Sequence, residues 1–179
     1  MTATPTGDFL VLDDGRPAVR LTRVYDHPIE RVWQFVTDPE ELVHWFPSRA
    51  EIELSPGGTV RYSGDPSLAD TTGKVLEIEA PQRLSFTWGP EEVHFELTAL
   101  DERRTRFTLT NVLSAVDAAA RNGAGWEVCL GALDARSADR AYDGPHAGPT
   151  PAWEQYYRAY RDAGIPSGAE IPGVDPETL

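Results

Sequence analysis

Apolar and polar residues alternate in three stretches between residues 84 and 111, and this pattern predicts β-strands. The positions on one face are Leu84, Phe86 and Trp88 in the first stretch, Val93, Phe95 and Leu97 in the second, and Phe107, Leu109 and Asn111 in the third. Strands with one apolar and one polar face are typical of an antiparallel sheet that is covered on one side only. The chain therefore needs another element to cover the apolar face.

Two short helices are predicted between residues 26 and 46. Asp26 followed by Pro28, and Asp38 followed by Pro39, indicate two helix starts, because an aspartate caps free backbone N–H groups and proline favours the first helical turn. An apolar stripe at helical spacing follows each start. The stripes are Ile29, Val32, Trp33 and Val36 in the first helix, and Leu42, Trp45 and Phe46 in the second.

A long helix after the strands is the predicted cover of the sheet. Residues 118–142 contain no proline, and Asp117 can cap their first turn. Gly123 and Gly125 lower helix stability, so we expect them to mark a close approach to the sheet or a bend. Near the N-terminus, a glycine-containing turn at residues 13–15 separates two apolar runs and predicts a β-hairpin.

Composition limits the class of protein. A chain of 179 residues with 40% hydrophobic residues can bury one sizeable core, so we expect a main domain over residues 1–146 and a linker with a further helix over residues 147–179. The net charge of −13 and the single lysine, Lys74, argue against a nucleic-acid partner. No apolar run approaches the roughly 20 residues of a membrane span. With one cysteine, Cys129, and no internal disulfide, we expect a cytoplasmic chain without a membrane partner.

The order of these elements resembles the helix-grip fold of the START-like (SRPBCC) superfamily, and in particular the branch named after the activator of the 90-kDa heat-shock protein ATPase. The resemblance is based on residues 27–33, 38–42 with Trp45, 56–58, 73–78 with Pro81, 84–88, 105–110 and 125–126. It implies an α+β fold in which a curved antiparallel sheet surrounds a long C-terminal helix, with a cavity between them. It implies no single activity, since the superfamily includes hydrophobic-ligand carriers, aromatic polyketide cyclases and co-chaperone domains.

The expected site is a pocket between the sheet and the long helix. We expect it to bind a small hydrophobic or aromatic molecule without catalysing a reaction, because apolar walls with one polar position combine affinity with orientation. The expected lining residues are Trp45, Phe46, Trp88, Phe95, Asn111, Trp126, Leu130 and Leu133. Asn111 is the polar member, and it must bond either a ligand or a loop or helix-end backbone group, because an unbonded buried amide costs free energy.

We expect neither a metal nor a cofactor. The four histidines, His27, His44, His94 and His146, lack the spacing of metal ligands. The neighbouring carboxylates Glu91 and Glu92 follow the turn at Gly89-Pro90, and we expect both to be solvated surface groups.

Two other classes of function stay open. A polyketide cyclase-like enzyme would need an acid or base in the cavity, for which Tyr62 and Glu127 are the candidates. A protein-interaction module of co-chaperone type is the third class, although we expect only a hairpin before the shared domain. A carrier would yield a co-purified small molecule, an interaction module a protein partner, and an enzyme turnover of an aromatic ketide.

A last helix is predicted after the Pro- and Gly-rich stretch. Thr150 can cap it, Pro151 can start it, and Gly164 can end it. Its aromatic stripe consists of Trp153, Tyr156, Tyr157 and Tyr160. A helix this short is marginal alone in water, so we expect the stripe to pack beside the long helix, across the cavity mouth, or onto a second copy of the chain in a homodimer.

Overall fold

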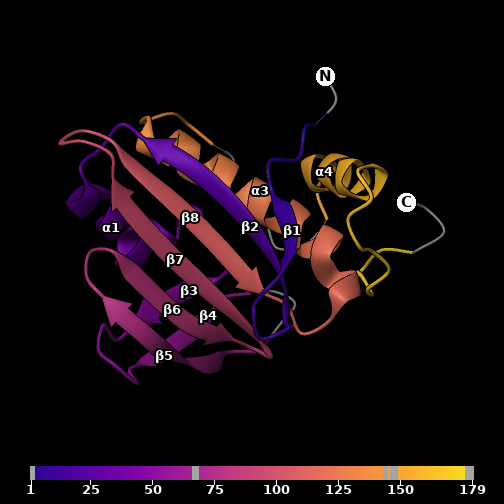
Figure 1. Cartoon of the computed structure of the whole chain (residues 1–179), viewed down its shortest axis with the longest axis horizontal. Helices are drawn as coiled ribbons and strands as arrows, with labels where there is room; N and C mark the ends of the chain where they lie inside the picture. The colour runs from indigo at the N-terminus through magenta and orange to yellow at the C-terminus, as the bar shows by residue number, and fades with distance from the viewer. Residues whose placement is uncertain (1–2, 66–68, 143–144, 146–148, 176–179) are drawn as a thin grey trace.

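The computed structural model describes residues 3–65, 69–142, 145 and 149–175. Eight antiparallel strands form one sheet in the order β1-β2-β8-β7-β6-β5-β4-β3 (Figure 1). The strands are β1 (Asp8–Val11), β2 (Pro17–Tyr25), β3 (Arg49–Ile52), β4 (Thr59–Ser63), β5 (Thr71–Glu79), β6 (Arg83–Trp88), β7 (Glu91–Ala99) and β8 (Thr105–Val112). The predicted hairpin is β1–β2, and the three alternating stretches are β6, β7 and β8.

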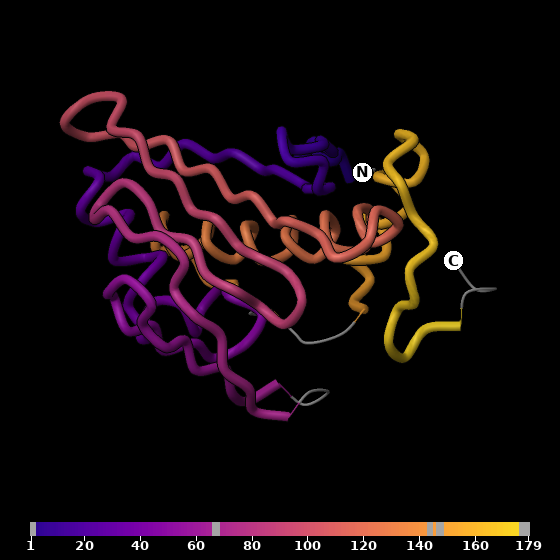
Figure 2. The backbone as a smooth tube through the Cα atoms, turned by 60° about the horizontal axis from the view of Figure 1, so that its bottom comes forward, coloured from indigo at the N-terminus to yellow at the C-terminus, as the bar shows by residue number. Residues whose placement is uncertain are grey.

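The helical elements are α1 (Ile29–Thr37), α2 (Pro39–Leu42), the 3-10 turn η1 (Val116–Ala118), α3 (Ala119–Ser137) and α4 (Pro151–Asp162). The helices α1, α2 and α3 lie against one face of this sheet, and α4 packs on α3. Figure 2 shows the sheet curving around α3, drawn in orange. This is the α+β helix-grip architecture that the resemblance implies. Within the described ranges, no helix has both the length and the apolar character that crossing a membrane requires.

The face of the sheet that meets α3 contains most of the core. Its cross-strand neighbours are Leu84, Phe95, Leu109 and Leu21 in one row, and Phe86, Val93, Asn111 and Val19 in the next. All of these side chains are buried. The phase of alternation predicted for β6, β7 and β8 is therefore correct, because residues two apart on a strand share a face.

The helix starts differ in part from the prediction. Asp38 caps α2 by accepting a hydrogen bond from the Glu40 N–H at 2.9 Å. In contrast, α1 begins at Ile29 without a side-chain cap, so Asp26 does not start it. Asp117 does not cap the long helix, because η1 precedes α3 and supplies its first turn. α3 ends at Ser137, several residues before the predicted end.

The last helix packs on a face of α3 different from the one that meets the sheet. Trp153, Tyr157 and Tyr160 of α4 are buried together with Ala120 and Ala124 of α3. Figure 2 shows this tail, in yellow, beside the N-terminal end of α3. The predicted boundary between residues 146 and 147 lies outside the described residues.

Gly123 and Gly125 of α3 face this tail and not the sheet. A Cβ added at Gly123 would lie 3.0 Å from the Tyr160 ring, and one at Gly125 would lie 3.9 Å from Trp153 Nε1. The predicted close approach therefore exists at Gly123, but its partner is α4. After α4, the chain continues along the start of α3, where the Ala120 N–H donates to the Pro166 carbonyl at 2.9 Å.

Candidate functional site

The aromatic residues predicted to line a pocket meet at one end of the core. The Phe46 ring centroid lies 5.8 Å from that of Trp88 and 5.7 Å from that of Trp126, and the two indoles lie 5.4 Å apart. Trp45 lies 5.9 Å from Phe95. The remaining apolar members, Leu130 and Leu133, belong to the same buried cluster. The structure thus brings all seven apolar residues of the predicted site into one aromatic cluster.

Side chains fill the space between these residues. Trp45, Phe95 and Trp126 are each at most 2% exposed. Trp88 alone among the eight predicted residues is half-buried rather than buried. It lies at the end of β6, next to the turn at Gly89. The cluster therefore has one side chain that reaches solvent, and the rest form closed core.

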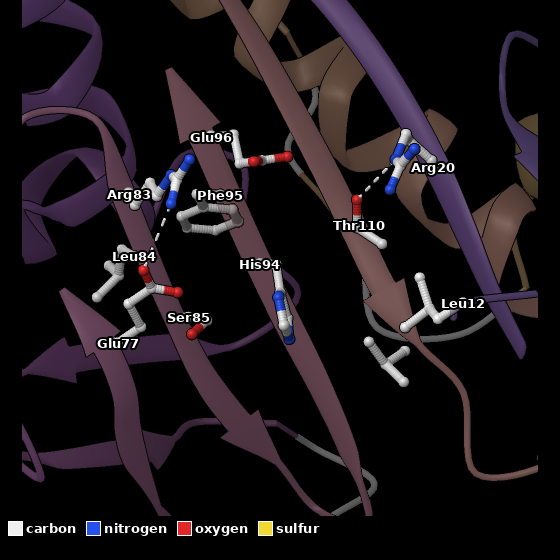
Figure 3. Close-up of a pocket in the computed structure, with 11 residues that line it drawn as sticks. Leu12, Arg20, Glu77, Arg83, Leu84, Ser85, His94, Phe95, Glu96 and Thr110 are labelled. Carbon is white, nitrogen blue, oxygen red and sulfur yellow. Dashed lines mark hydrogen bonds and ion pairs between the residues drawn. The ribbon is translucent and has the colours of Figure 1, made fainter. Parts of the chain in front are cut away.

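Two pockets in the described part of the chain lie outside the space between the aromatic rings of this cluster. One, of about 250 Å³, is a shallow depression on the outer face of the sheet, where Arg20, Thr110 and His94 project from neighbouring strands (Figure 3). Phe95 is the one predicted residue that also lines it. The other lies at the turn over residues 101–104. Neither provides the apolar walls that the sequence analysis expects.

Asn111 is bonded within the protein. Its Oδ1 accepts hydrogen bonds from Asn122 Nδ2 at 2.9 Å and from Trp126 Nε1 at 3.0 Å. Its Nδ2 donates to Glu91 Oε2 at 3.0 Å and to the Glu92 carbonyl at 3.2 Å. Asn122 Nδ2 also donates to Glu91 Oε2, at 2.8 Å. Glu91, Asn111 and Asn122 form a polar cluster that joins β7, β8 and α3 beside the indole of Trp126.

The predicted solvated position is wrong for Glu91. Glu91 opens β7 directly across from Trp88 and is 8% exposed. Glu92 points to the outer face, where it pairs with Arg16 at 2.6 Å and His94 at 2.8 Å. The alternation of Val93 and the inward residues after it already places residue 91 inside, so the sequence contained the signal.

The two residues predicted for a cyclase-like reaction are engaged in other bonds. The Tyr62 hydroxyl donates to the Thr87 carbonyl at 2.7 Å, and burial raises its pKa. Glu127 accepts a hydrogen bond from the Tyr160 hydroxyl at 2.8 Å and pairs with Arg23 at 3.1 Å, on the side of α3 that meets the tail. Both polar groups are therefore held by bonds to other groups of the protein. Across the ranges that the structure describes, no group of three histidine, cysteine, aspartate or glutamate residues is placed to hold a metal ion.

Solved structures share this fold over most of the chain. A conserved protein of unknown function from Enterococcus faecalis, EF2215, matches with a TM-score of 0.70 and 19% identity over 88% of this chain and 89% of that one. CalU16 from Micromonospora echinospora matches with a TM-score of 0.66 and 22% identity over 91% and 94% of the two chains. BPP1335 from Bordetella parapertussis gives a TM-score of 0.63 and 23% identity over 98% and 100%. At these identities the likeness establishes the fold.

A comparison with curated proteins gave no match. The family model described as Activator of Hsp90 ATPase homolog 1-like protein matches residues 26–138. This stretch begins just before α1, ends just after α3, and contains both the aromatic and the polar cluster. The resemblance predicted from the sequence is confirmed, and this chain belongs to the family of Activator of Hsp90 ATPase homolog 1-like proteins.

Proposed function

We propose that this chain binds a small aromatic or otherwise apolar molecule at the end of the core where Phe46, Trp88 and Trp126 meet. The observation that supports the proposal most directly is the half-buried Trp88 ring beside a polar cluster enclosed in apolar core. Apolar walls with a few fixed polar groups are the usual composition of a small-molecule site.

Binding at this place requires the Trp88 side chain to move. Its ring is already partly exposed, so it leaves the core with less loss of buried apolar area than Trp45 or Trp126 would. An aromatic ligand then takes the place of the Trp88 indole against Phe46 and Trp126. The ligand ring covers the apolar surface that the indole exposes when it moves. The free energy of this opening reduces the observed affinity, because only the open fraction of the protein binds.

Calorimetric titration of the full chain with naphthylethanol, flavonoids and aromatic polyketides tests the proposal. We expect saturable binding of at least one compound to the unmodified protein, with shifts of the Trp88 and Trp126 indole N–H signals in NMR spectra. Trp88→Ala should bind the same compound at least as tightly, because the opening step is removed. Trp33→Ala, which truncates a partly buried tryptophan of α1, is the matched control and should leave the affinity unchanged.

Binding of a compound to the unmodified protein is the result that supports the proposal. Binding to Trp88→Ala alone would mean that the substitution had created a cavity, as large-to-small core substitutions do, and it would count against the proposal. The proposal is also rejected if no aromatic compound, neutral or charged, binds either protein.

A further inference from the structure

Three glutamates of the described chain are buried, and their partners differ. Glu41 pairs with Arg31 at 3.0 Å and with Arg136 at 2.8 Å. Glu127 pairs with Arg23 at 3.1 Å. Glu91 is the exception, because no cationic side chain of the described residues lies within ion-pair distance of it. A buried carboxylate without a cation is costly, so the position of Glu91 needs an explanation.

The bonds of Glu91 are distributed unevenly over its two oxygens. Oε2 accepts from the amides of Asn111 at 3.0 Å and Asn122 at 2.8 Å. Among the residues that the structure describes, Oε1 has only the Ser114 hydroxyl at 3.5 Å, which is the outer limit of a hydrogen bond. A carboxylate can accept about four hydrogen bonds. One oxygen of Glu91 is therefore held in place by the amides, while the other lacks a strong donor.

The nearest cation in this network does not reach the carboxylate. Arg121 Nε donates to Asn122 Oδ1 at 3.0 Å, and Arg121 Nη1 donates to the Glu170 carbonyl at 2.8 Å. Arg121 thus fixes the far side of the Asn122 amide and leaves Glu91 Oε1 to another group. Trp88, directly across the strand pair from Glu91, and Trp126 place two indole rings at this point.

We propose that Glu91 is the recognition group for a protonated amine, and that the ligand of this site is an aromatic molecule with an ammonium group. This inference rests on the binding function proposed above and adds the chemical class of the ligand. The ammonium donates to Glu91 Oε1, the donor that the protein itself does not supply. The aromatic ring of the ligand packs against Phe46 and Trp126, in the place that the Trp88 ring leaves. The acidic chain, with a net charge of −13, further favours the approach of a cation.

Three probes that share one ring system test the charge preference. Naphthylethylamine, naphthylethanol and naphthylacetate carry a cationic, a neutral and an anionic group at neutral pH. We expect the full chain to bind the amine about tenfold or more tightly than the alcohol, since hydrogen bonds between charged groups are the strong ones. The acetate should bind weakest, because its carboxylate would face that of Glu91 and like charges repel.

Glu91→Gln and Glu92→Gln form a matched pair of variants. Each removes one negative charge from β7, but Glu92 lies on the outer face with Arg16 and His94. We expect Glu91→Gln to abolish the preference for the amine while alcohol binding persists, and Glu92→Gln to retain the preference. Circular dichroism and thermal melting verify that both variants fold, and Glu91→Asp, which keeps the charge, should retain part of the preference.

The outcomes separate this inference from the binding function. Equal affinities of amine and alcohol for the unmodified protein would overturn the inference and leave the binding function standing. An equal loss of amine preference in Glu91→Gln and Glu92→Gln would also overturn it, because the effect would then reflect net charge. If none of the three probes and none of the neutral compounds above binds, both proposals fail together.

Discussion

Removing the Tyr160 hydroxyl should loosen the contact between the tail and the N-terminal segment. Tyr160 is fully buried, and its hydroxyl donates to Glu127 Oε1 at 2.8 Å while it accepts from the Gly7 N–H at 2.9 Å. Tyr160→Phe keeps the ring and deletes both bonds. Tyr157→Phe is the matched control, because that ring is buried in the same cluster and its hydroxyl makes no hydrogen bond to any residue the structure describes.

The size of the effect follows from the two bonds lost. A hydrogen bond to a charged group contributes about 1.5–3 kcal/mol and a neutral one about 1 kcal/mol. Glu127 keeps Arg23 and Thr6 as partners, so it is not left unpaired. We therefore expect Tyr160→Phe to lower the free energy of unfolding by about 3 kcal/mol, which for a chain of this length lowers Tm by about 6–12 °C. Tyr157→Phe should change the free energy by less than about 0.5 kcal/mol.

Urea denaturation and amide hydrogen exchange measure the two parts of this prediction. The Gly7 amide should exchange faster in Tyr160→Phe, because its acceptor is gone, while the amides of β7 and β8 should change only as far as global stability changes. If the two phenylalanine variants are equally stable, or if the Gly7 amide is protected as before, the hydroxyl does not anchor the tail. The apolar stripe of α4 would then account for docking by itself.

Two further predictions concern α3. Gly123→Ala should lower the free energy of unfolding, because its Cβ would lie 3.0 Å from the Tyr160 ring. Gly125→Ala has room for the added methyl group and should raise the free energy of unfolding by about 0.5–1 kcal/mol through helix propensity. Equal shifts of Tm in the two variants would contradict the packing at Gly123. Burial raises the pKa of the Cys129 thiol to about 12, so the folded state binds this proton more tightly than the unfolded state, whose thiol has a pKa of about 8.5. The resulting stability is complete below about pH 8.5 and falls as the pH rises toward 12. In denaturation measured from about pH 8 to 11, Cys129→Ala should therefore reduce the fall of the unfolding free energy with pH. An unchanged dependence on pH would show that the thiol does not contribute.

The sequence predicts the sheet better than it predicts the helix ends. Alternation along β6, β7 and β8 reports burial of one face directly, so the inward residues could be named in advance. The residue at which a helix starts depends on the geometry of the preceding turn, where more than one residue can take the capping position. Asp38 caps α2 as predicted, but Pro28 and η1 take the positions that Asp26 and Asp117 would have used.

The sequence predicts which residues of the candidate site lie together, but it does not predict how tightly their side chains pack. Inward residues at the same end of strands and helices must meet, which is why Trp88 and Trp126 lie in contact. Whether a space stays open between them depends on rotamers, and no pattern in the sequence encodes these. The turn beside Glu91 predicts an exposed side chain, but its place in the alternation of β7 buries it. Asn122 bonds a residue 31 positions away, and no spacing rule marks such a pair.

The bond between Gly7 and the Tyr160 hydroxyl joins segments 153 positions apart. Contacts of such long separation form late in folding, because the closure of the intervening chain must come first. Every strand and α3 also precede α4 along the chain, so the ribosome synthesises them before Tyr160. As long as α4 is not docked, the surface that receives it, including the carboxylate of Glu127, is exposed to water.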